Sequence, residues 1–109
     1  LGGEGSVTIR ESYGPLINDD EIVDVVRDTA EKILQKENVL ISEIPNMGTE
    51  DFSYFSKSVK ACFYNLGCRN KEKNAVYPLH SSHFDIDEDC LKTGVKIHVN
   101  SVMHLLNKH

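Results

Sequence analysis

No apolar run in the 109-residue sequence approaches the ~20 residues that a membrane-spanning helix needs, which excludes a transmembrane protein. The first five residues lack both the basic start and the apolar core of a signal peptide. Positive charge is also scarce, because 12 Lys and Arg face 17 Asp and Glu, whereas nucleic-acid binders need a basic surface. We therefore expect one globular domain, or part of one, that binds neither membranes nor nucleic acids.

Cysteine pairs are missing as well. Cys62, Cys68 and Cys90 are odd in number and include no CxxC motif, which argues against a disulfide framework and a structural zinc site. Reduced thiols favour a cytoplasmic protein. No Gly-x-Ser-x-Gly motif and no glycine-rich phosphate loop is present, so the sequence offers no support for a serine hydrolase or a nucleotide-binding loop.

Helical periodicity is present in two segments. The first prediction is a surface helix over residues 20–36, with Asn18 as its N-cap and Glu21 reaching back to it. Its apolar stripe is formed by Ile22, Val23, Val26, Ala30, Ile33 and Leu34.

The second predicted helix covers residues 87–106 and has an unusually wide apolar face. Gly94 inside it costs ~1 kcal/mol relative to Ala, which implies close backbone packing there. His98 lies on the apolar face, where we expect a core histidine with one hydrogen-bond partner. The whole face consists of Leu91, Val95, His98, Val99, Val102, Met103, Leu105 and Leu106.

Strand-like patterns separate these helices. Residues 6–11 alternate polar and apolar side chains, residues 39–41 form a short apolar run, and residues 59–66 are almost continuously apolar, as in an interior strand. A short helix over residues 50–58, capped by Thr49, is predicted between the last two. This order predicts an α/β fold with a largely buried sheet, in which the first strand belongs to a different sheet.

Two segments carry residues suited to a functional site. His80 and His83 lie on an irregular segment between a strand and a helix, where loops commonly build sites; they are either metal ligands or ordinary surface histidines. The Gly48-Thr49-Glu50 turn precedes a helix, where backbone N–H groups bind oxyanions; alternatively, Thr49 and the acidic residues simply stabilise the helix start.

Three ordered motifs resemble one enzyme family: Met47-Gly48-Thr49-Glu50-Asp51-Phe52, then Cys62-Phe63-Tyr64-Asn65-Leu66-Gly67, then Pro78-Leu79-His80-Ser81 with Phe84-Asp85-Ile86-Asp87-Glu88. They resemble the C-terminal part of aminoacylase-type amidohydrolases, dinuclear-metal exopeptidases that include hippurate hydrolase and the indoleacetyl-amino-acid hydrolases. The order and spacing match over residues 6–107. Ser82 and Gly14 stand where the family frequently has proline.

The resemblance implies a partial catalytic domain of zinc-exopeptidase type, a buried mixed sheet with flanking helices. Residues 1–14 would be the terminal strand of a lid and dimerisation domain, and residues 15–109 the C-terminal segment of the catalytic domain. It implies that His80 is a metal ligand, that Gly48, Thr49 and Glu50 line the substrate side of the cleft, and that His83 is not a metal ligand. The remaining ligands and the general base belong to an N-terminal half outside this sequence.

The implied parent protein hydrolyses the amide bond of N-acyl amino acids or small peptides with a pair of zinc or manganese ions, as a cytoplasmic homodimer. With a single ligand, the 109-residue chain itself is expected to bind no metal tightly and to be inactive. The alternative is a small acidic, non-catalytic α/β module that binds a partner through exposed apolar surface.

Overall fold

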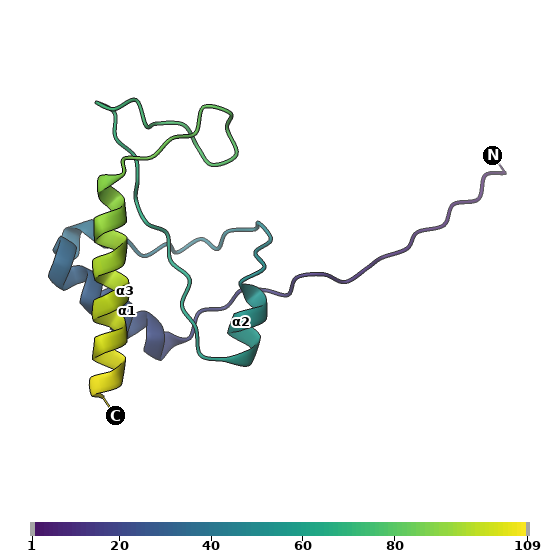
Figure 1. The fold of residues 1–109 in the computed structure, drawn as a ribbon. Coiled ribbons are helices and arrows are strands. Elements are labelled where there is room, and N and C mark those ends of the chain that lie inside the picture. The colour runs from purple at the N-terminus through teal and green to yellow at the C-terminus, as the bar shows by residue number, and fades with distance from the viewer. Residues whose placement is uncertain (1, 109) are drawn as a thin grey trace.

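The structure, a computed structural model, describes residues 2–108. It consists of helix α1 (Asp20–Leu34), the 3₁₀ turn η1 (Lys36–Asn38), the short helix α2 (Ser53–Ser58) and helix α3 (Asp89–Asn107), joined by long irregular segments (Figure 1). The two long helices predicted from the sequence are confirmed, with ends shifted by one or two residues. Among residues 2–108, no helix is both long enough and apolar enough to cross a membrane.

Helix α1 begins with a side-chain cap. The Asp19 carboxylate Oδ1 accepts a hydrogen bond from the backbone N–H of Ile22 at 3.2 Å, satisfying one of the free donors of the first turn. The prediction of Asn18 as the cap is therefore wrong by one residue. The Asn18 amide instead bridges to the backbone of Phe63, donating to its carbonyl at 2.8 Å and accepting from its N–H at 2.7 Å.

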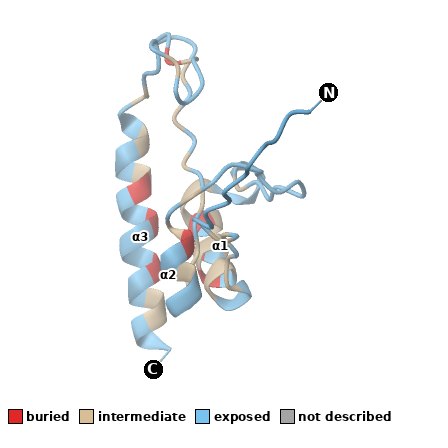
Figure 2. Ribbon diagram, turned by 90° about the vertical axis from the view of Figure 1, so that its right-hand side faces the viewer, coloured by how far each residue is buried: buried red, intermediate tan, exposed pale blue. Residues whose placement is uncertain are grey.

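The core lies between α1 and α3, which pack against each other (Figure 1). Figure 2 shows the buried stretch of α3 on the side turned toward the other helices. Gly94 allows the close approach expected from the sequence, because a Cβ there would lie only 3.0 Å from the Leu66 Cδ2 atom. The buried residues of the two helices are Val25, Thr29, Ala30, Gly94, Ile97 and Ser101.

The predicted core face of α3 is wrong for this chain. The helix buries the stripe around Gly94 and Ile97, whereas Val95 is 64% exposed and Leu106 is 66% exposed. His98 is also exposed and packs its ring on Tyr64, with 5.6 Å between the ring centroids, so it is not a core histidine. Apolar residues surround most of the helix, and α1 covers only one side of it.

The predicted strands are absent from residues 2–108, where an isolated antiparallel bridge between Asn70 and Ala75 is the only β-pairing. A strand requires a neighbouring backbone for its N–H and C=O groups. Around residues 61–63 some of these groups are satisfied differently: the Ala61 carbonyl accepts from the Asp19 N–H at 2.9 Å, and the Asn18 amide pairs with Phe63. Within residues 2–108 the buried sheet of the predicted α/β fold is consequently not formed.

Apolar side chains outside the helices are largely in solvent. Residues 6–11 run extended and exposed away from the helices, and Leu40 and Met47 are 89% and 91% exposed. The radius of gyration is 18.7 Å, whereas a compact chain of this length has about 13 Å. The accessible surface is 9638 Å², compared with about 6,100 Å² for a typical folded protein of the same mass.

Candidate functional site

His80 occupies the tip of a tight turn in the loop that leads to α3. Its φ angle is 68°, in the left-handed region that side chains with a Cβ rarely adopt. The turn is closed by the backbone N–H of Ser81, which donates to the Pro78 carbonyl at 3.2 Å. The His80 side chain is exposed, so the imidazole is accessible from solvent and is not a satisfied core histidine.

The second half of this loop is held by further contacts. The Ser81 carbonyl accepts from the Phe84 N–H at 3.0 Å, and the Ser81 hydroxyl oxygen accepts from the His83 N–H at 3.1 Å. The His83 ring packs against the Tyr77 ring, with centroids 5.2 Å apart and planes inclined by 42°. The loop is therefore ordered by local contacts despite its irregular backbone.

Asp87 ties the loop to the preceding segment. Its backbone N–H donates to the Cys68 carbonyl at 2.9 Å, and its carboxylate accepts from the Asn70 amide at 2.7 Å and pairs with the Lys73 ammonium. The hydrogen bonds from Asn70 and Lys73 lower the pKa of Asp87 to about 2. These contacts hold the segment after the His80 loop against the segment that precedes the loop.

The Gly48-Thr49-Glu50 turn has a different arrangement from the predicted one. Helix α2 begins at Ser53, and Thr49 does not cap it. The Glu50 carboxylate accepts from the Phe52 N–H at 3.1 Å, and the Gly48 N–H donates to the Asn46 side chain at 2.8 Å. Both the acidic group and one N–H of the turn are already satisfied within the chain.

The structure does not bring these two candidates together. Among residues 2–108, no hydrogen bond, ion pair or ring contact links His80 or His83 to the Gly48-Thr49-Glu50 turn. The same residues contain no group of three or more His, Cys, Asp or Glu side chains placed to hold a metal ion. Zinc needs three or four protein ligands, so the described residues do not form a complete zinc site.

Neither of two half-buried cysteines offers an alternative nucleophile. Burial raises the pKa of the Cys62 thiol and, as the largest cause, that of the Cys90 thiol. The thiolate is the reactive form, and both shifts keep the sulfur protonated.

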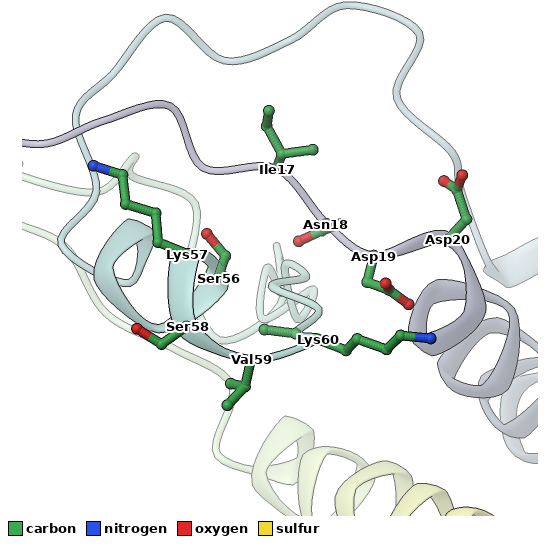
Figure 3. Close-up of a pocket in the computed structure, with 10 residues that line it drawn as sticks. Ile17, Asn18, Asp19, Asp20, Ser56, Lys57, Ser58, Val59 and Lys60 are labelled. Atoms are coloured by element: carbon green, nitrogen blue, oxygen red, sulfur yellow. The ribbon is translucent and has the colours of Figure 1, made fainter.

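A hollow of about 510 Å³, which sequence reasoning missed, lies between the start of α1 and the end of α2. It is lined by two short segments, residues 17–20 and 56–61 (Figure 3). Lys57 and Lys60 extend in opposite directions there, and Lys60 pairs with Glu21 at 2.6 Å. The Asp19 carboxylate accepts from the Ile22 N–H at the start of α1, so this backbone donor is not open to an anion in the hollow.

Comparison with known sequences assigns the chain to one family of hydrolases. The profile described as "Peptidase family M20/M25/M40" matches residues 4–104. The chain is 35% identical to "Thermostable carboxypeptidase 1" of Saccharolobus solfataricus over 92% of its own length and 24% of that protein. It is also 35% identical to "IAA-amino acid hydrolase ILR1-like 6" of Arabidopsis thaliana over 89% of its length and 21% of that protein.

A third relative is "Putative amidohydrolase YhaA" of Bacillus subtilis, 29% identical over 88% of the chain and 24% of that protein. The chain thus spans about a quarter of the length of the curated relatives that it matches. No solved structure matches it.

Proposed function

The chain belongs to peptidase family M20/M25/M40. We propose that it is the C-terminal portion of a metal-dependent amidohydrolase. The observation that carries the proposal is the family match over residues 4–104, within which the Pro78-Leu79-His80-Ser81 motif forms an ordered turn with an exposed imidazole. His80 supplies one metal ligand, and the other ligands come from sequence outside these 109 residues.

The chemistry proposed for the parent enzyme is hydrolysis of the amide bond of an N-acyl amino acid or a small peptide. The printed names of the relatives, a carboxypeptidase, an IAA-amino acid hydrolase and an amidohydrolase, support this substrate class. A pair of zinc or manganese ions, when bound, lowers the pKa of a bound water and polarises the scissile carbonyl. His80 fits such a role because an accessible neutral imidazole is a common metal ligand.

The same proposal assigns roles to other segments of the chain. Residues 1–14 belong to a lid and dimerisation domain, and the extended, unpaired backbone of residues 6–11 supports a partner strand outside the chain. The Gly48-Thr49-Glu50 turn lines the substrate side of the cleft through its backbone, since the Glu50 carboxylate is bonded to Phe52. We also propose a cytoplasmic location, which the three free cysteines support.

The large accessible surface supports the view that other polypeptide covers part of this chain. Val95 and Leu106 on α3 and Leu40 and Met47 before α2 are all more than half exposed. These side chains lie on segments that the family match includes, so the preceding part of an M20 polypeptide is the proposed cover. With one ligand and an open core, the isolated chain is proposed to be inactive.

The test is metal content and hydrolysis of an N-acyl amino acid, measured for the 109-residue chain and for the longer polypeptide encoded by its native reading frame. We expect bound metal and turnover for the longer protein and neither for the isolated chain. His80→Ala in the longer protein should abolish activity or remove one metal ion. A native reading frame that starts immediately before Leu1 would contradict the proposal and favour a non-catalytic module that binds a partner.

A further inference from the structure

The loop that presents His80 is closed at its base by an aromatic contact. Tyr77 and His83 stand three residues before and three residues after His80, and their rings lie 5.2 Å apart with an angle of 42° between the planes. This places His80 at the tip of a closed loop with two rings packed together at its base. The family resemblance assigns no metal-ligand role to His83.

From this geometry we propose that Tyr77 and His83 form a clasp that positions His80 for metal binding. The clasp rests on the proposed function, because it presupposes that His80 is the ligand. His83 is then a positioning residue. Its ring packs on Tyr77 and holds the loop closed, while His80 alone binds the metal.

The backbone of His80 explains why such a clasp is needed. A φ of 68° is unfavourable for a residue with a Cβ, and it persists only where the surrounding structure holds it. The hydrogen bonds from Ser81 to Pro78 and from His83 to Ser81 lie in an exposed loop, where water competes with each of them. Ser82 adds no restraint on φ, as a proline there would.

The ring contact differs from these hydrogen bonds because it joins the two ends of the loop. Fixing the ends removes most of the loop's freedom before a metal arrives, so less conformational entropy is lost when His80 binds it. Removing a hydrogen-bond partner of a metal-binding histidine typically weakens metal binding 10–100-fold, without changing the number of ligands. The clasp acts on His80 through the loop backbone and not through such a bond, so the effect expected of it lies at the lower end of this range.

The experiment uses the longer native polypeptide and zinc ion as the probe. Zinc dissociation constants are measured by competition with a chelator for wild type, His83→Ala, Tyr77→Leu and His83→Phe. His98→Ala is the matched control, since His98 also packs on a tyrosine but lies on α3. We expect His83→Ala and Tyr77→Leu each to weaken zinc binding about tenfold. His83→Phe, which keeps an aromatic ring but has no metal-binding nitrogen, should restore most of that loss, and His98→Ala should have no effect.

A second readout on the same polypeptide is independent of metal affinity. In the metal-free protein, the NMR signals of the His83 ring protons should show a ring-current shift from Tyr77 that disappears in Tyr77→Leu. The clasp is overturned if that shift is absent, or if His83→Phe binds zinc as weakly as His83→Ala, which would make His83 a ligand.

The zinc affinities also distinguish a wrong assignment of His80 as the ligand from a wrong assignment of the clasp. If His80→Ala retains all of its zinc, the ligand assignment is wrong and the clasp is overturned with it. If His80→Ala loses zinc while His83→Ala binds it as tightly as wild type, the clasp alone is wrong.

Discussion

Gln35 ends helix α1 in a backbone conformation that only glycine adopts easily. Its φ and ψ angles are 69° and 151°, and its N–H still closes the last helical turn onto the Glu31 carbonyl. Because a side chain with a Cβ is strained there, we predict that Gln35→Gly stabilises the chain by about 1 kcal/mol. Urea unfolding measures the change. Lys36→Gly is the matched control and should destabilise the chain by about 0.5–1 kcal/mol, since its φ is not positive.

Asp87 makes a prediction about pH. Asn70 and Lys73 lower its pKa from 3.8 to about 2, so folding favours the ionised carboxylate. The stabilisation is fully present above pH 4 and is lost as the pH falls from 4 toward 2. The free energy of unfolding of Asp87→Asn, measured by urea titration, should therefore be lower than that of wild type at pH 6. The two should converge near pH 2, and a constant difference across this range would contradict the assignment.

Single-residue roles were only partly predictable from the sequence. The run Asn18-Asp19-Asp20-Glu21 contains several residues that can cap a helix, and local pattern placed the helix correctly. The choice among them depends on a distant contact, because Phe63 engages Asn18 and leaves Asp19 as the cap. His80 was proposed as a metal ligand through its motif, but its left-handed φ and the Tyr77–His83 contact depend on the folded loop.

The packing of α3 against the extended chain before it is tight at one position. A Cβ on Gly94 would lie 3.0 Å from Leu66 Cδ2, so Gly94→Ala sets a steric cost against a gain in helix propensity of about 1 kcal/mol. We predict that Gly94→Ala fails to stabilise the chain by itself, but does stabilise it in a Leu66→Ala background. Thermal unfolding of the four proteins of this cycle measures the coupling. If the effects of Gly94→Ala and Leu66→Ala on stability simply add in the double variant, the contact between the two positions does not prevent stabilisation by Gly94→Ala.

The two long helices predicted from the sequence form, whereas the predicted strands do not form within residues 2–108, and the difference has a physical reason. The periodicity of α1 and α3 reflects hydrogen bonds between residues four apart, which the segment itself provides. The apolar run at residues 59–66 predicts a strand only if other strands supply partners, and none does so within residues 2–108. The pattern of α3 likewise showed a wide apolar face but not which part of the helix this chain covers.

Taken together, the chain exposes more surface than a folded protein of its mass. Its 9638 Å² exceeds the typical value by roughly 3,500 Å², whereas a standard interface buries about 800 Å² per partner. The extended segment before α1 contributes part of this excess, and the apolar residues of α3 contribute another part. The exposed apolar side chains of α3 are the part of this surface that the proposed covering polypeptide would bury.

This surface gives the last prediction, made on α3. In the isolated chain Val95 is 64% exposed, so Val95→Lys should change the free energy of unfolding by no more than about 0.5 kcal/mol. In the longer native polypeptide the same lysine would be buried without a partner, and the cost should reach about 3 kcal/mol or more. Lys96→Gln, at the neighbouring exposed position, is the control and should have little effect in either protein. Urea unfolding measures the effect of Val95→Lys in the isolated chain and in the longer polypeptide. Equal changes in the free energy of unfolding in the two proteins would mean that nothing covers this face of α3.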